Sequence, residues 1–176
     1  MSTVFSQGRW EFTKKAHVAA ETQFYPLMWP GGVAFEDVTK TAQDLDYAID
    51  CQLAVTVDGL KAPIRMSIQE RFRQPEGMDY GDITVTEWNL DTNLPSELHK
   101  LGAQMFVYGF YDESCDHIVL AVAVDVGLMQ WALAHDELPY VRRRRGDQSF
   151  LGFRFGALRK LGAVLHVHDR RESTAA

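Results

Sequence analysis

Residues 49–73 read IDCQLAVTVDGLKAPIRMSIQERFR, and this stretch decides the fold. Apolar residues alternate with polar or small ones over Ile49–Val57 and again over Ile64–Phe72. A two-residue period of this kind is typical of a strand with one buried face. Because Asp58-Gly59 between the two segments favours a turn, we expect them to pair as an antiparallel hairpin.

The segments on either side of the hairpin predict a mixed α/β protein. Before the hairpin we expect a helix over Trp10–Phe24 that Pro26 ends. After it we expect a third meander strand over Ile83–Trp88, a helix over Glu97–Gln104, and strands over Met105–Tyr111 and His117–Val126. The last part of the chain predicts a helix over Gly127–His135, a strand over Phe150–Phe155, a short helix over Ala157–Leu161 and a strand over Ala163–His168. No repeat or linker divides the chain, so residues 1–176 are predicted to form one domain. The polar tail from Arg170 is expected to be disordered.

Composition excludes several classes of protein. With 176 residues, 46% hydrophobic and 24% charged, the chain has the proportions of a globular domain. The apolar run Ile118–Val126 contains Asp125 and is too short for a membrane helix, and the first thirty residues lack the pattern of a signal peptide. We therefore expect a cytoplasmic protein. The two cysteines, Cys51 and Cys115, are too few for a disulfide scaffold or a cysteine-rich zinc site and are predicted to be buried thiols.

The predicted order of helix, three-strand meander, helix and strand resembles the αβββαβ core of the PD-(D/E)XK nuclease superfamily, the restriction-endonuclease-like fold. The resemblance covers about half the chain, from Asp44 to Val126. Sites of that superfamily place an Asp near the start of the second core strand, and an acidic residue or Gln two positions before a Lys on the next strand. The candidates here are Asp46 and Asp50 in LDYAIDCQLAV, followed by Gln69 and Arg71 in SIQERFR.

The spacing has a chemical reason. Residues two apart on a strand point to the same face, so a metal ligand and a cation can meet at one phosphate. The resemblance thus implies a DNA nuclease in which Asp46, Asp50 and Gln69 hold Mg²⁺ or Mn²⁺ and Arg71 clamps the phosphate. Glu70 is a further acidic candidate, although strand alternation points it to the opposite face unless a bulge intervenes. The resemblance also admits a homodimer, because superfamily members that cut two strands often work in pairs.

Two departures from the superfamily pattern support an alternative. Arg71 stands where Lys is expected and remains protonated, so it cannot act as a general base. Gln69 offers a neutral carbonyl oxygen in place of a carboxylate, which attracts Mg²⁺ more weakly. The alternative hypothesis is therefore a catalytically inactive module that binds nucleic acid or protein on the same fold. An unrelated α/β accessory protein is a third possibility.

Several other polar residues have both a functional and a structural interpretation. Glu97 and Lys100, three apart on one helical face, are either part of the site or a surface pair. His166 and His168, followed by Asp169, suggest either a metal site or a polar strand end.

Basic side chains predict contact with a nucleic-acid backbone. The net charge is −6, so cations must be gathered locally to bind phosphates. The predicted groove consists of Arg65, Arg71, Arg73 and Lys100, and the run Arg142, Arg143, Arg144 and Arg145 is either a second contact or a solvated loop. Because Arg71 is expected at the surface of a cleft, Arg71→Ala is predicted to leave the melting temperature nearly unchanged.

Overall fold

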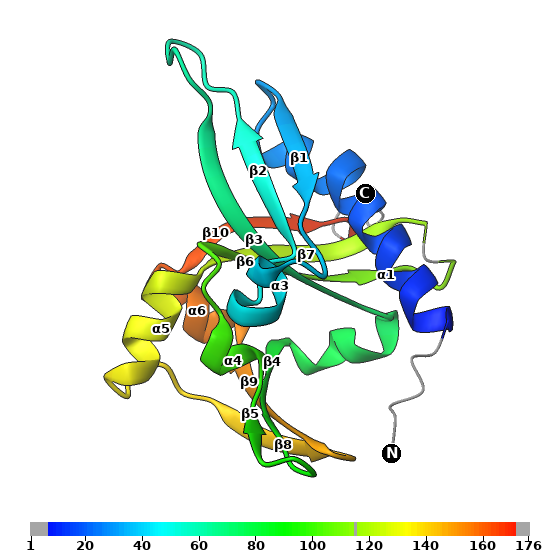
Figure 1. The fold of residues 1–176 in the computed structure, drawn as a ribbon, viewed down its shortest axis with the longest axis vertical. Helices are drawn as coiled ribbons and strands as arrows, with labels where there is room; N and C mark the ends of the chain where they lie inside the picture. Colours follow the sequence, from blue (N-terminus) through cyan, green and yellow to red (C-terminus); the bar gives the residue numbers. More distant parts are fainter. Residues whose placement is uncertain (1–6, 115, 172–176) are drawn as a thin grey trace.

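The computed structural model describes residues 7–114 and 116–171 and shows a mixed sheet flanked by helices (Figure 1). Within these residues, six strands form the main sheet in the order β1 (Val33–Asp37), β2 (Cys51–Val55), β3 (Ile64–Arg73), β6 (Met105–Tyr111), β7 (Ile118–Asp125) and β10 (Val164–Asp169). A second sheet has the order β5 (Leu94–Pro95), β4 (Asp82–Asn89), β9 (Gln148–Arg154) and β8 (Val141–Arg145). The helical segments are α1 (Gln7–Ala19), η1 (Ala20–Phe24), α2 (Tyr25–Met28), α3 (Ala42–Tyr47), η2 (Pro75–Tyr80), α4 (Glu97–Lys100), α5 (Val126–Ala134) and α6 (Phe155–Leu161).

The hairpin predicted from residues 49–73 is confirmed. β2 and β3 pair antiparallel from Cys51↔Ile68 to Val55↔Ile64, and the hairpin projects from one end of the molecule (Figure 1). The connection is longer than a two-residue turn, but Gly59 does adopt a positive φ of 87° within it.

The third strand of the meander was predicted wrongly. The strand expected over Ile83–Trp88 exists as β4, but it pairs with β9 in the second sheet. The side of β2 that faces away from β3 pairs with β1, for which no strand was predicted. The far edge of β3 pairs with β6, which runs parallel to it, and η2 carries the chain away from this edge. Alternating apolar residues predict a strand, but they do not predict which other strand it pairs with.

With this change, the order of helix, three antiparallel strands, helix and parallel strand is present as α1, β1 to β3, α4 and β6. The mixed sheet with helices on its faces is consistent with a restriction-endonuclease-like core. β4 and β5 are inserted between β3 and β6, and the second sheet extends from the end of the molecule opposite the β2–β3 hairpin (Figure 1).

Other boundaries shift for local reasons. The first helical region continues through η1 into α2, because Pro26 lies in the first turn of α2, where its missing N–H is not needed. α4 is a single turn that ends at Lys100 and does not reach Gln104. The arginine run, interpreted as either a nucleic-acid contact or a solvated loop, forms strand β8.

Both faces of the main sheet are covered, so its central strands are buried. β6 is buried along its whole length, as its apolar sequence predicts, and β7 is buried over most of its residues. One core cluster packs α1 and η1 against the sheet, and the other packs the opposite face against the second sheet, α5 and α6. At Gly109 of β6 a Cβ atom would lie 2.6 Å from the Phe72 ring and 3.1 Å from the Leu120 carbonyl oxygen, so the packing requires glycine.

Three further expectations concern termini, cysteines and membranes. Cys51 is a buried thiol, whereas Cys115 and residues 172–176 of the predicted disordered tail lie outside the described residues. Arg170, at the expected start of that tail, donates its backbone N–H to Val119 O at 2.9 Å. Among the described residues, no helix is long and apolar enough to cross a membrane.

Candidate active site

A cleft of about 320 Å³ lies on the face of β3 turned away from α1. Its described lining residues come from α3 and the residue after it, β3 and α4, and they are Asp44, Leu45, Ala48, Gln69, Arg71, Glu97 and Lys100. Gln69 and Arg71 share this face because they are two apart on a strand, whereas Ile68 and Phe72 pack on the α1 side. The structure therefore brings four of the predicted site residues together: Gln69, Arg71, Glu97 and Lys100.

Arg71 is held in place by neighbours on two elements. Its guanidinium forms an ion pair with Glu97 and donates to Thr86 Oγ1 at 3.0 Å and Thr84 O at 3.3 Å. The exposed fraction of the side chain is 20% for Arg71 and 9% for Glu97. Arg71 lines the cleft, as predicted, but α4 and β4 hold its guanidinium, so we expect its removal to affect stability.

Two buried oxygen atoms in the cleft have no hydrogen-bond partner within the described structure. They are Gln69 Oε1 and Glu97 Oε1. The Gln69 amide nitrogen donates to Glu70 O at 3.3 Å, and Glu97 Oε2 accepts from Thr86 N at 3.1 Å in addition to Arg71. A buried acceptor without a partner costs about 1–3 kcal/mol, so this pair of oxygens favours a bound cation or hydrogen-bond donor.

Asp50 lies at the point where β2 stops pairing with β3. Its backbone N–H donates to Ile68 O at 2.9 Å, and its carboxylate accepts the Glu70 N–H at 2.7 Å. The side chain thus replaces the strand partner that β3 loses there. Burial raises the pKa of Asp50 to about 7, even though the Glu70 N–H hydrogen bond acts in the opposite direction.

The acidic residue that α3 contributes to the cleft is Asp44. Asp46 is exposed, and neither Asp46 nor Asp50 is among the described lining residues. Asp44 accepts the Lys40 N–H at 2.7 Å near the start of α3. The sequence did not single out Asp44, because the superfamily pattern pointed to Asp46 and Asp50 and no helix was expected where the Thr41 cap begins α3.

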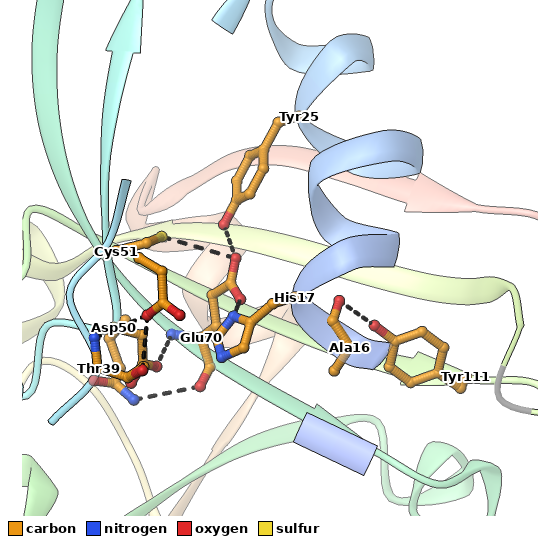
Figure 2. A network of polar contacts seen from close by, with 10 residues as sticks. Ala16, His17, Tyr25, Thr39, Asp50, Cys51, Glu70 and Tyr111 are labelled. Carbon is orange, nitrogen blue, oxygen red and sulfur yellow. Dashed lines mark hydrogen bonds and ion pairs between the residues drawn. The ribbon is translucent and has the colours of Figure 1, made fainter. Parts of the chain in front are cut away.

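Glu70 points to the opposite face of β3, as alternation predicts, and forms a buried network with α1 and α2. Figure 2 shows its carboxylate between the Tyr25 hydroxyl, which donates to it, and His17 Nδ1, with Cys51 Sγ at 4.0 Å. The exposed fraction of the Glu70 side chain is 1%. This network connects the first helical region to the centre of the sheet. No local sequence motif predicted it, because His17 and Tyr25 are far from Glu70 in sequence.

The network shifts the ionisation of its members. Burial lowers the pKa of His17, but the hydrogen bond and negative charge of Glu70 outweigh it, so the pKa is raised overall. Burial raises the pKa of Tyr25 and of Cys51, and the charge of Glu70 adds to both effects. Glu70 is thus paired with His17 and the un-ionised Tyr25 hydroxyl.

Of the four residues of the predicted basic groove, Arg71 and Lys100 line the cleft. Arg65 is exposed on the hairpin, and Arg73 donates to Thr84 Oγ1 at 3.4 Å; neither is among the described lining residues of the cleft. Lys100 Nζ donates to Leu45 O at 3.1 Å at the cleft rim.

Two arginines of β8 form ion pairs with β4. Arg142 binds the Glu87 carboxylate at 2.7 Å and Arg143 binds Asp82 at 2.6 Å, and Arg142, Arg144 and Arg145 are exposed. Two of the four arginines in the predicted run therefore connect the strands of the second sheet.

The donor set in the cleft suits a hard cation. Amide and carboxylate oxygens are what Mg²⁺ prefers, and Mg²⁺ usually takes one or two protein carboxylates while keeping several waters. Among residues 7–114 and 116–171, no group of three His, Cys, Asp or Glu side chains is placed to hold a metal. Gln69 Oε1 and Glu97 Oε1 are the unpartnered oxygens of the cleft that would contact such an ion.

Comparisons with known proteins add little. No protein-family model matches the chain, and no curated protein matches it. Among solved structures, a nuclease from a fusselovirus matches with a TM-score of 0.35 and 10% sequence identity, over 92% of this chain and 93% of that chain. Because the TM-score and the identity are both low, the function proposed below rests on this chain's own residues.

Proposed function

We propose that this protein is a metal-dependent nucleic-acid phosphodiesterase that cleaves DNA at the cleft formed by Gln69, Arg71, Glu97 and Lys100. The observation that carries the proposal is the pair of buried, unpartnered oxygens, Gln69 Oε1 and Glu97 Oε1, beside two cationic side chains. A divalent cation would give the Gln69 and Glu97 oxygens a partner, and a phosphate would do the same for the cationic side chains of the cleft.

Each residue has a proposed role that follows from its chemistry. Gln69 and Glu97 would hold Mg²⁺ or Mn²⁺, which when bound supplies positive charge to the phosphate and acidifies water. Lys100, at the exposed rim, binds a non-bridging phosphate oxygen, and Arg71 orients Glu97 through their ion pair. Asp50 holds the backbone of β3 in place through its hydrogen bond from the Glu70 N–H.

One experiment tests the enzymatic proposal. Cleavage of plasmid and single-stranded DNA is measured with Mg²⁺, with Mn²⁺ and with a chelator, for the wild type and for Glu97→Gln and Lys100→Ala. We expect cleavage that requires the metal and falls at least about 10-fold in each variant, as for the loss of a charged contact. Glu36→Gln is the matched control, because Glu36 is exposed on β1, away from the described lining of the cleft. Metal-independent cleavage, or full activity in both variants, would refute the proposal.

The inactive binding module remains a second candidate, because the Arg71–Glu97 ion pair ties up both charged groups and no three-ligand metal cluster occurs in the described residues. The same samples separate the two. DNA binding without cleavage, weakening steeply with salt and lowered by Lys100→Ala, supports the module. Neither binding nor cleavage at low salt contradicts both nucleic-acid functions and favours a module that binds protein.

A further inference from the structure

A second cleft, of about 390 Å³, lies on the η1 side of the main sheet. Its described lining residues are Gln23, His117, His168 and Arg170, and none of them lines the Gln69 cleft. β10 turns His166 and His168 towards η1, where the His166 ring packs against Phe24 with ring centroids 5.5 Å apart. The cleft therefore gathers residues from η1, from the turn before β7, and from the end of β10 and the residue after it.

The walls of this cleft are fixed by hydrogen bonds. The Gln23 side chain donates to Asp116 O at 2.8 Å and accepts the Ile118 N–H at 3.1 Å. η1 therefore holds the backbone on both sides of His117. The Asp112 carboxylate accepts the N–H groups of Asp116 at 3.1 Å and His117 at 3.3 Å, which shapes the same turn. A site whose backbone is already ordered loses little entropy when a ligand binds.

The side chains are donors suited to an anion. Arg170 is permanently charged, each imidazole donates at least one N–H, and the described lining residues include no carboxylate. Asp169, the acidic residue of the histidine segment, is taken by Arg171, whose guanidinium binds it at 2.5 Å. A divalent metal would face the Arg170 charge without a carboxylate to offset it, so the metal-site interpretation of His166, His168 and Asp169 is disfavoured.

We infer that the cleft lined by His117, His168 and Arg170 is a binding site for a phosphate group. Arginine binds a phosphate through two parallel N–H bonds, and the two histidines donate from the neighbouring walls. The inference is independent of the nuclease proposal, because the two clefts share no described lining residue. The phosphate is either free or the terminal group of a nucleic-acid strand.

The test is a titration of the full chain with inorganic phosphate at constant pH, followed through the histidine ring proton signals in NMR. His117→Gln and His168→Gln assign the signals. We expect saturable shifts of both residues, and a loss of affinity of about 10-fold or more in Arg170→Ala, as for a charged hydrogen bond. Arg159→Ala is the matched control, because Arg159 is exposed on α6, which packs on the other face of the main sheet, and it should retain the wild-type affinity within about twofold.

The source of the phosphate is distinguished with oligonucleotides. If a 5′-phosphorylated oligonucleotide shifts the same signals more strongly than inorganic phosphate and its unphosphorylated counterpart does not, the ligand is a strand terminus. If inorganic phosphate alone shifts them, the ligand is the free ion. No saturable shift with either probe, equal affinity in Arg170→Ala, or a response of the two histidines to Zn²⁺ but not to phosphate would overturn the inference.

Discussion

Replacing Arg71 with alanine should destabilise the protein substantially. The substitution removes the ion pair with Glu97 and the hydrogen bonds to Thr84 and Thr86. It leaves the Glu97 carboxylate, whose exposed fraction is 9%, with the Thr86 N–H as its hydrogen bond and with Oε1 still unpartnered. Removing one partner of a buried ion pair costs about 3 kcal/mol. For a chain of this length, that corresponds to a fall in melting temperature of about 6–12 °C.

The assay is urea unfolding followed by circular dichroism, with the melting temperature as a second readout. Arg65→Ala is the matched control, because Arg65 lies on the same strand but is exposed on the hairpin, and its effect should stay within about 0.5 kcal/mol. Adding Glu97→Leu to Arg71→Met should recover most of the lost stability, since no unpaired charge remains buried. An Arg71→Ala variant as stable as the wild type would show that the ion pair contributes nothing and that the guanidinium lies free in the cleft.

Three further substitutions test the buried groups. Because the pKa of Asp50 is raised by folding to about 7, its contribution to stability is lost as pH rises from about 4 to about 7. The stability of Asp50→Asn relative to the wild type should therefore increase over that window in urea titrations, and a constant difference would contradict the shift. Tyr25→Phe should cost about 1–3 kcal/mol, because it removes a hydroxyl from the buried Glu70 carboxylate; unchanged urea unfolding would argue against this hydrogen bond. Gly109→Ala should cost about 1–3 kcal/mol by overpacking, whereas Gly156→Ala, where nothing lies within 4 Å of the added Cβ, should not destabilise; equal melting temperatures for the two would refute the packing argument.

The pattern of residues along the chain determined what depends on local periodicity. Alternation placed Gln69 and Arg71 on one face of β3 and Glu70 on the other, because successive side chains of a strand point in opposite directions. The β2–β3 hairpin and the apolar strands β6 and β7 were predictable for the same reason. A restriction-endonuclease-like core with a mixed central sheet could therefore be predicted from the sequence.

Tertiary structure decided which segments meet. No local pattern indicates that Met105–Tyr111, rather than Ile83–Trp88, pairs with β3, because strand propensity does not encode the partner. The Arg71–Glu97 and His17–Glu70 pairs join elements far apart in sequence, and the burial that makes them matter arises only when helices cover the sheet. Local periodicity fixes where a side chain points, whereas long-range packing decides what it meets there and how much water remains around it.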